Sequence, residues 1–346
     1  MSDFKTPNVT IVLPVYNAEP YLRQCLDSVI NQTMWEIQII CVNDGSTDGS
    51  PAILEEYAAK DPRILIIHQE NQGGGSARNT AFPHIKGKYT YFVDPDDWID
   101  LQLCEKLFKC AEESQAEMVY LNFRCIFQTK FSHQIEPRHL LSNKDLPLEE
   151  RKKVFFRITG TWRKFWSSHF LLTNQITFVA GKRPNNDVLQ NWKGVCFAER
   201  IEVLDEKLYF YRIHGNSYQT NIGNNFNFSV LQTYDEVREF LINSGYYDRY
   251  KETFLALKLR RVFVFYSNSS LRVREKLFEK AVMNFNEEER VFCQKLSRFN
   301  CEYFFCRAVF AKKMQHKLQY IFFSVILLLC VYLYLFGLKI HKLLRS

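Results

Sequence analysis

Short apolar runs alternate with amphipathic stretches along the first 125 residues. The β-branched run Val9–Val15 predicts a strand, and apolar positions recur at helical spacing from Pro20 to Ile30. The step repeats from Ile37–Val42 to a helix opening at Pro51, because proline suits the first helical turn. Further strands are predicted at Ile64–His68, Tyr89–Val93 and Met118–Phe123, and further helices at Ser76–Phe82 and Leu101–Glu113. This alternation predicts an α/β fold with a Rossmann-like, mostly parallel sheet covered by helices on both faces.

The pattern changes twice after this region. Residues 131–150 are polar and irregular, which predicts an excursion over the surface, and residues 154–214 return to aromatic and apolar segments. Beyond Asn216, three segments rich in Lys, Arg and Phe predict helices: Phe226–Ile242, Tyr250–Tyr266 and Glu287–Met314. We therefore predict a domain over residues 1–220 followed by a helical, basic and aromatic region over 221–315.

The last segment, residues 316–346, is a hydrophobic stretch with a basic tail. Tyr320–Leu338 holds nineteen residues without a charge, and lysine or arginine residues flank both ends. A helix of that length reaches about 28 Å, close to the roughly 30 Å hydrocarbon core of a bilayer. We predict a single membrane helix here, with an interfacial helix and a buried core helix as the alternatives.

Composition and charge narrow the class of protein. The chain has 346 residues, 47% of them apolar and 15% aromatic, which predicts a packed globule and excludes a disordered or fibrous chain. The net charge of +7 is compatible with phosphorylated substrates, nucleic acid or anionic lipid. The basic residues lie beside apolar helices rather than in an aromatic groove, so we expect no nucleic acid partner. Ten cysteines without a C-x-x-C pair indicate a reducing compartment, and no signal peptide is recognised at the start.

Polar clusters follow four of the predicted strands. They are Tyr16-Asn17, Asn43–Asp48, Gly73–Asn79 and Asp94–Asp97. Each alone has an ordinary explanation, such as turn chemistry or glycine flexibility. Because parallel strands point the same way, the four clusters are expected to gather along one edge of the sheet, where α/β proteins bind ligands. Together they predict a ligand crevice.

The acidic cluster and the glycine loop suggest what that crevice binds. Asp94, Asp96 and Asp97 end an apolar run, and several hard oxygen donors at one strand end suit Mg²⁺ or Mn²⁺, which would hold a phosphate-bearing substrate. The alternative is a solvated acidic turn. Arg78 is expected to face a phosphate or the carboxylates, with a helix-surface charge as the alternative. The loop Gly73–Gly75 matches neither a P-loop nor a dinucleotide-binding fingerprint, which argues against both enzyme classes.

Five motifs between Val9 and Trp98 carry a family resemblance. They read T-I-V-L-P-V-Y-N, Y-L-R-Q-C-L-D-S-V-I-N-Q-T, I-I-C-V-N-D-G-S-T-D-G-S, N-Q-G-G-G-S-A-R-N and Y-F-V-D-P-D-D-W. In this order and spacing, the run closely resembles the bacterial family 2 glycosyltransferases of the GT-A fold. A weaker resemblance continues from Trp162 to Ser217, and no counterpart is recognised after about residue 220.

The resemblance implies an inverting transfer of a sugar from a nucleotide-sugar donor, usually a UDP-sugar, to an acceptor hydroxyl. It places the uracil and ribose of the donor against Pro14, Tyr16, Asn17 and Asp44. It also places Gly74, Arg78 and Arg212 in the donor site. The family often has Asp-Asp where this chain has Asn43-Asp44, a change we expect to be tolerated because Asn also hydrogen-bonds a base edge.

The resemblance also assigns the metal and the base. The Asp-x-Asp motif matches Asp94 and Asp96, of which Asp96 would ligate Mn²⁺ or Mg²⁺ and Asp94 would contact the ribose, the metal or its water. We expect Asp97 to accept hydrogen bonds at the start of the following helix. The family's Glu-Asp pair matches Asn186-Asp187, so Asp187 is the candidate catalytic base although the Glu is absent. The alternative is that Asp187 only caps a helix.

Two further groups of residues have alternative roles. Arg212 and His214 resemble a family segment that closes over the diphosphate, and they are equally compatible with surface positions. The aromatic residues Trp162, Phe165, Trp166 and Trp192 would stack on acceptor sugar rings or pack in the core, of which core packing is the expectation.

The sequence thus predicts a glycosyltransferase at the cytoplasmic face of the bacterial inner membrane. It would move a hexose or N-acetylhexosamine from a UDP-sugar to a glycan or glycolipid acceptor, such as lipooligosaccharide, capsule or a lipid-linked saccharide, with the inner leaflet as a partner. The alternatives are a nucleotidyltransferase and a catalytically lapsed, membrane-associated module that binds UDP-sugars. The donor sugar, the acceptor and the linkage are not predicted.

Overall fold

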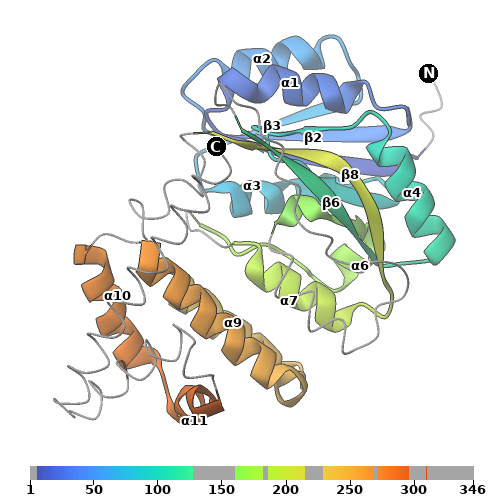
Figure 1. The fold of residues 1–346 in the computed structure, drawn as a ribbon. Helices are drawn as coiled ribbons and strands as arrows, with labels where there is room; N and C mark the ends of the chain where they lie inside the picture. Colours follow the sequence, from blue (N-terminus) through green and yellow to red (C-terminus); the bar gives the residue numbers. More distant parts are fainter. Residues whose placement is uncertain are drawn as a thin grey trace. The chain divides into compact units, whose positions relative to one another are not determined.

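The chain forms two compact units, Met1–Ile213 and His214–Ser346. The structure, a computed structural model, describes residues 6–127, 160–181, 186–214, 229–268 and 271–295, together with residue 309. The first unit contains the sheet and the second is helical (Figure 1). The predicted three-part division at residues 220 and 315 stays a prediction.

One eight-stranded sheet organises the first unit, in the order β3-β2-β1-β4-β7-β6-β8-β5. The strands are β1 (Val9–Val15), β2 (Ile37–Asp44), β3 (Ile64–Gln69), β4 (Tyr89–Phe92), β5 (Trp98–Ile99), β6 (Met118–Phe127), β7 (Lys164–Ser167) and β8 (Ile201–Ile213). Strands β1 to β4 are parallel to one another, and β6 is parallel to β8. Strands β5 and β7 run antiparallel to their neighbours. The sheet is therefore mixed, and β7 joins its two parallel halves.

Helices cover both faces of this sheet, as the sequence predicts. They are α1 (Glu19–Ile30), α2 (Ser50–Ala58), α3 (Gly74–Ala81), α4 (Leu103–Ser114), α6 (Ser168–Thr173) and α7 (Val188–Phe197). Helices α1, α2 and α4 lie on one face, whereas α3, α6 and α7 lie on the other (Figure 1). All seven residues of β1 are consequently buried, which explains its unbroken apolar run.

The second unit consists of helices held partly by buried charges. The described helices are α8 (Ser229–Asn243), α9 (Tyr247–Asn268), α10 (Leu271–Asn284) and α11 (Glu287–Lys295). Helix α10 was not predicted, and the part of the predicted helix Glu287–Met314 beyond Lys295 lies outside the continuously described residues. Glu289 is fully buried and accepts from Lys258 Nζ at 2.9 Å and from Arg238 Nη2 at 2.7 Å. This ion pair ties α8, α9 and α11 together.

The sequence predicted that a C-terminal hydrophobic helix attaches the protein to the membrane, and the structure does not support this prediction. Among the described helices, none is both long enough and apolar enough to cross a bilayer. Helix α9 has the length, with 22 residues, but Arg249, Lys251 and Lys258 lie along it, and such charges are costly in hydrocarbon. The segment Tyr320–Leu338 itself lies outside the described residues.

A buried ion pair fixes the entry to β3. The Arg63 side chain is 4% exposed, and its Nη2 donates to Asp61 Oδ2 and to the Ile30 carbonyl, each at 2.6 Å. Its guanidinium also lies 3.8 Å from the ring centroid of Trp35. Burial opposes ionisation of Asp61, but the hydrogen bonds and charge of Arg63 outweigh it and lower the pKa of Asp61. Arg63 thereby joins the end of α1 to the start of β3.

We predict that Arg63→Met lowers the free energy of unfolding by about 3–5 kcal/mol, because Asp61 would remain as an uncompensated buried charge. The matched control is Arg23→Met, which should change the free energy of unfolding little because solvent screens its exposed pair with Glu56. Urea denaturation at pH 7 measures both. The difference between wild type and Arg63→Met should shrink as the pH falls through and below about 4, since a lowered carboxyl pKa stabilises only above that range. Equal losses in the two variants would contradict this account.

Candidate functional site

The loops after β1 and β2 meet at one edge of the sheet. Asn17 has a left-handed backbone with φ of 47°, and its N–H donates to Ser46 Oγ at 3.1 Å. Its side-chain Oδ1 accepts from the Thr47 N–H at 2.8 Å. Pro14 is buried at the end of β1, whereas the Tyr16 side chain is 49% exposed beside these contacts. The first two predicted polar clusters are therefore in direct contact.

Asp44 connects the second cluster to the glycine loop. It is 2% exposed, and its Oδ1 accepts from Gln69 Nε2 at 2.7 Å and from the Gln72 N–H at 2.8 Å. Its Oδ2 accepts from the Gly73 N–H at 2.8 Å. Gly73 has φ of 91°, a conformation that glycine adopts without strain. Both Asp44 oxygens thus hold the loop that leads into α3.

Arg78 joins the third cluster to the fourth. Its Nη2 donates to Asp94 Oδ1 at 2.5 Å, and its Nη1 donates to the Gly74 carbonyl at 3.1 Å. Because Arg78 is 8% exposed, the helix-surface alternative does not describe it. Burial raises the pKa of Asp94, Arg78 opposes that rise, and the charges of Asp96 and Asp187 add to it. The four clusters thus form one contiguous polar edge, as expected from parallel strands.

Asp97 is a structural acceptor, but not at the start of a helix as predicted. It is fully buried, and its Oδ2 accepts from the Tyr209 hydroxyl at 2.5 Å while its Oδ1 accepts from the Arg212 N–H at 2.7 Å. Both donors belong to β8. Burial raises the pKa of Asp97, and the charges of Asp96 and Asp94 raise it further. Asp97 therefore couples the acidic turn to β8.

The Arg212 side chain backs the acidic turn instead of lying on the surface. It is 7% exposed, and its Nε donates to the Asp96 carbonyl at 2.7 Å. Its Nη2 donates to Gln24 Oε1 at 2.6 Å, and its guanidinium lies 4.6 Å from the Trp98 ring centroid. Burial lowers the pKa of Arg212, and nearby acidic groups oppose this. In this conformation, Arg212 orients the backbone of Asp96.

Helix α3 also holds the segment that leads to Asp187, a role that the sequence reasoning missed. Asn79 Nδ2 donates to the Phe178 carbonyl and its Oδ1 accepts from the Phe178 N–H, each at 2.9 Å. Ser76 Oγ accepts from the Gly181 N–H at 3.0 Å. A Cβ at Gly75 would lie 2.3 Å from the Val179 carbonyl oxygen, so this close approach requires glycine. Gly75, Ser76 and Asn79 all belong to the motif N-Q-G-G-G-S-A-R-N, which was the sequence feature that could have indicated these contacts.

Asp187 lies at the N-cap of α7, close to the acidic cluster. Its side chain makes no capping hydrogen bond, so the helix-cap alternative does not account for it. The residue is half-buried, and its charge is near enough to raise the pKa of Asp94. The Asn186 carbonyl accepts from the Val179 N–H at 3.0 Å, which links Asp187 to the segment held by α3.

Asp94 and Asp96 are the residues whose donor set fits a divalent cation. Within the described ranges, no three His, Cys, Asp or Glu side chains converge to form a complete cage. Mg²⁺ is commonly bound by one or two carboxylates together with substrate phosphates, so two aspartates at the crevice fit that chemistry. Burial is the main cause of the raised pKa of Asp94, and the charge of Asp96 raises it further, so an added positive charge at these carboxylates would be favourable.

The aromatic residues proposed for the acceptor pack in the core instead. Trp162 is 7% exposed, and Phe165, Trp166 and Trp192 are at most 1% exposed. The Trp162 ring is stacked with Tyr209 at a centroid distance of 4.5 Å. The core-packing expectation is confirmed for all four.

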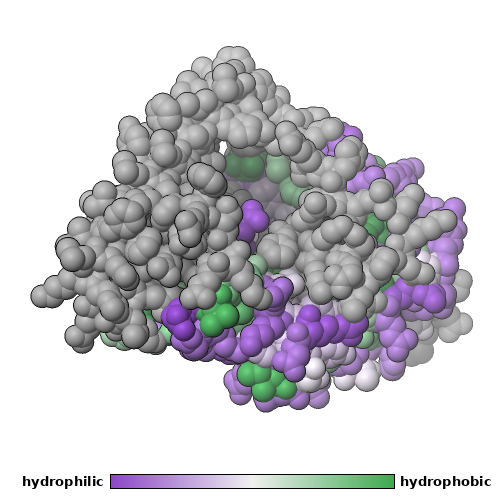
Figure 2. Space-filling view, turned by 60° about the horizontal axis from the view of Figure 1, so that its bottom comes forward, coloured by the Kyte–Doolittle hydropathy of each residue, from purple (hydrophilic) through white to green (hydrophobic). Residues whose placement is uncertain are grey.

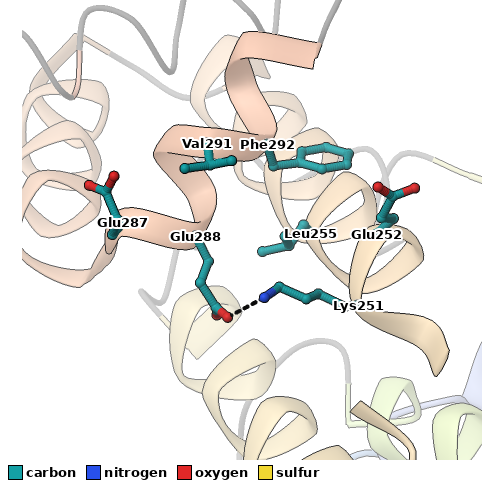
Figure 3. Close-up of a pocket in the computed structure, with 7 residues that line it drawn as sticks. All are labelled: Lys251, Glu252, Leu255, Glu287, Glu288, Val291 and Phe292. Atoms are coloured by element: carbon teal, nitrogen blue, oxygen red, sulfur yellow. Dashed lines mark ion pairs between the residues drawn. The ribbon is translucent and has the colours of Figure 1, made fainter. Parts of the chain in front are cut away.

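The helical unit has a pocket of its own (Figure 3). Its volume is about 360 Å³, and Lys251 within it pairs with Glu288 at 2.6 Å. None of the predicted site residues lines it. On the face drawn in Figure 2, the described surface is mostly hydrophilic, with hydrophobic residues in small separate groups. Such scattered groups are normal on a protein surface.

Comparisons of the sequence with known proteins identify relatives. Residues 10–169 match the family described as Glycosyl transferase family 2. A relative from Bacillus subtilis, described as "Putative glycosyltransferase EpsH", is 33% identical over 261 residues, which cover 73% of this chain and 75% of EpsH. A poly(ribitol-phosphate) beta-glucosyltransferase of Bacillus spizizenii is 32% identical over 214 residues, 59% of this chain but only 32% of that longer protein.

The fold also has a solved counterpart. TarS of S. aureus, residues 1–349 in complex with UDP, superposes with a TM-score of 0.63 at 19% identity, over 90% of this chain and 89% of that one. The same protein in complex with UDP-GlcNAc gives a TM-score of 0.61. This likeness confirms the predicted GT-A fold followed by a helical region, and the match reaches beyond residue 220, where the sequence suggested no counterpart. The chain belongs to glycosyltransferase family 2.

Proposed function

We propose that this glycosyltransferase moves a sugar, with inversion, from a UDP-sugar to an acceptor hydroxyl. The observation that carries the proposal is the meeting of the Arg78–Asp94 pair and Asp187 at one sheet edge, where helix α3 carries Arg78 and also holds the segment that leads to Asp187. The TarS structures in complex with UDP and UDP-GlcNAc support the choice of UDP.

The donor extends along the polar edge in this proposal. Pro14, Tyr16, Asn17 and Asp44 form the end that takes the uracil and ribose, where the Tyr16 ring offers an exposed stacking face. Asp44 acts by holding the loop at Gln72 and Gly73, because its oxygens already accept their N–H groups. The diphosphate then lies against Gly74 and Arg78, and Arg212 supports it from behind Asp96.

Asp96 and Asp94 would hold the Mn²⁺ or Mg²⁺. When bound, such an ion neutralises the negative charge that grows on the departing diphosphate. The chain's own part is to keep two carboxylates at the crevice: Arg78 fixes Asp94, and Arg212 fixes the backbone of Asp96.

The transfer itself needs one proton acceptor. The acceptor oxygen forms a bond to the anomeric carbon while the bond from that carbon to the diphosphate oxygen breaks, and its electron pair leaves with UDP. The proton of the acceptor hydroxyl passes to the carboxylate of Asp187. Asn186 replaces the family's Glu but contributes its backbone carbonyl, which any residue supplies.

A donor screen tests the proposed function. We expect UDP release from at least one of UDP-Glc, UDP-Gal, UDP-GlcNAc and UDP-GalNAc with Mn²⁺ present, consistent with transfer of a hexose or N-acetylhexosamine to a surface glycan. UDP binding without release from any of them would favour the lapsed module.

We predict that Asp187→Asn lowers kcat for transfer by about 10²–10⁴-fold, because the amide cannot accept the proton. UDP affinity measured by calorimetry should stay within about twofold, since the residue contacts the acceptor side of the crevice. Asp248→Asn, at the exposed start of α9, is the control. Near-normal turnover of Asp187→Asn would contradict the base assignment.

We predict that Asp96→Asn weakens Mn²⁺ binding in the presence of UDP at least about tenfold, with little change in melting temperature. Asp97→Asn should instead lower the melting temperature and leave Mn²⁺ binding little changed, because the two oxygens of Asp97 accept hydrogen bonds from Tyr209 and Arg212. Calorimetric titration of Mn²⁺ and a thermal melt separate the two variants. Unchanged Mn²⁺ affinity in Asp96→Asn would remove this residue from the metal site.

A further inference from the structure

Lys164, on the central strand β7, is a buried cation without an evident partner. Its side chain is fully buried, and within the described part of the chain its Nζ has no hydrogen-bond acceptor. Burial lowers the pKa of Lys164 to about 8, whereas the charge of Asp187 raises it and that of Arg163 lowers it further. A buried ammonium is costly unless an anion compensates it, so the position of Lys164 requires an explanation.

Helix α7 lies over this part of the sheet. Lys164 and Trp166 point to the same face of β7, since side chains alternate along a strand. A Cβ at Gly194 on α7 would lie 2.5 Å from Cη2 of Trp166, so the helix packs tightly there. One turn nearer its start, Asn191 Oδ1 accepts from the Tyr120 hydroxyl at 3.0 Å, and Tyr120 is the register partner of Lys164 on β6. Helix α7 therefore runs with its N-terminus toward the Lys164 end of β7.

A second buried donor marks the same interface. Gln190 on α7 is fully buried, and its Oε1 accepts from Thr161 Oγ1 at 3.2 Å. Its Nε2 has no partner among the described residues. The helix side that faces the sheet thus carries Gln190, Asn191 and Gly194, and Asp187 precedes them by one turn. Asp187 is the acid whose charge acts on Lys164.

We propose that Lys164 is a positioning residue for the transfer, whose buried ammonium orients the Asp187 carboxylate toward the acceptor. This rests on the proposed role of Asp187 as the base. The charged groups that face the pair are Arg163 beside Lys164 and Asp94 beside Asp187.

A double-mutant cycle in stability tests the pairing without any assay of activity. Asp187→Asn should lower the urea midpoint because it leaves the buried ammonium without its anion, and adding Lys164→Met should restore the midpoint. Lys193→Met, also on α7 but bonded to the Gln175 carbonyl, is the control and should not restore it. Additive effects of Lys164→Met and Asp187→Asn would overturn the pairing.

Kinetics test the consequence for transfer. Lys164→Met should lower kcat about 10–100-fold while the donor KM stays within about twofold, because the proposed role is to orient the base and not to bind the donor. Lys164→Arg should recover part of the lost rate. In enzyme that already carries Asp187→Asn, adding Lys164→Met should lower kcat by less than about a further twofold. Unchanged kcat in Lys164→Met would overturn the proposal. A wild-type enzyme that uses no donor would instead refute the proposed function, and the stability cycle would still decide the pairing.

Discussion

The burial of carboxylates at the end of β4 is the constraint on which the site depends. Asp97 is fully buried and the Asp94 side chain is 25% exposed, so both carboxylates need partners that compensate their charge. Compensation comes from two separate elements, since Arg78 of α3 bonds Asp94 while Tyr209 and Arg212 of β8 bond Asp97. The acidic turn therefore fixes where α3 and β8 must lie. Asp96 between them is supported through its backbone carbonyl, which accepts a hydrogen bond from Arg212 Nε.

Helix α3 gives the site its internal geometry. One side of this short helix bonds Asp94 through Arg78, and another holds residues 178–181 through Asn79 and Ser76. A single rigid element thus sets the separation between the proposed metal carboxylates and Asp187. Such preorganisation matters because small displacements of reacting groups cost large factors in rate. The requirement for glycine at position 75 follows from the same close contact.

The sequence predicted the first half of the sheet well because β1, β2 and β4 are buried on both faces and read as apolar runs. The edge strand β3 is only partly buried but is also a run of apolar residues. It also predicted that their polar ends converge, since parallel strands share an edge. Strand β7 was missed because four residues give too short a pattern, and its Lys164 is a residue type that is rarely buried. The donors to Asp97 lie 112 and 115 positions away in the sequence, which no local pattern reveals. The predicted membrane location is contradicted, since no described helix is both long and apolar enough to cross a bilayer, and the segment Tyr320–Leu338 lies outside the described residues.

The most direct test of the account is a crystal structure of the enzyme grown with UDP and Mn²⁺, with the metal located by anomalous scattering. The account predicts one Mn²⁺ at the end of β4, bound to the carboxylate of Asp96 or Asp94 and to diphosphate oxygens, with the uracil beside Tyr16 and the Asp44 loop. A nucleotide bound elsewhere, or a Mn²⁺ that touches neither aspartate, would contradict it.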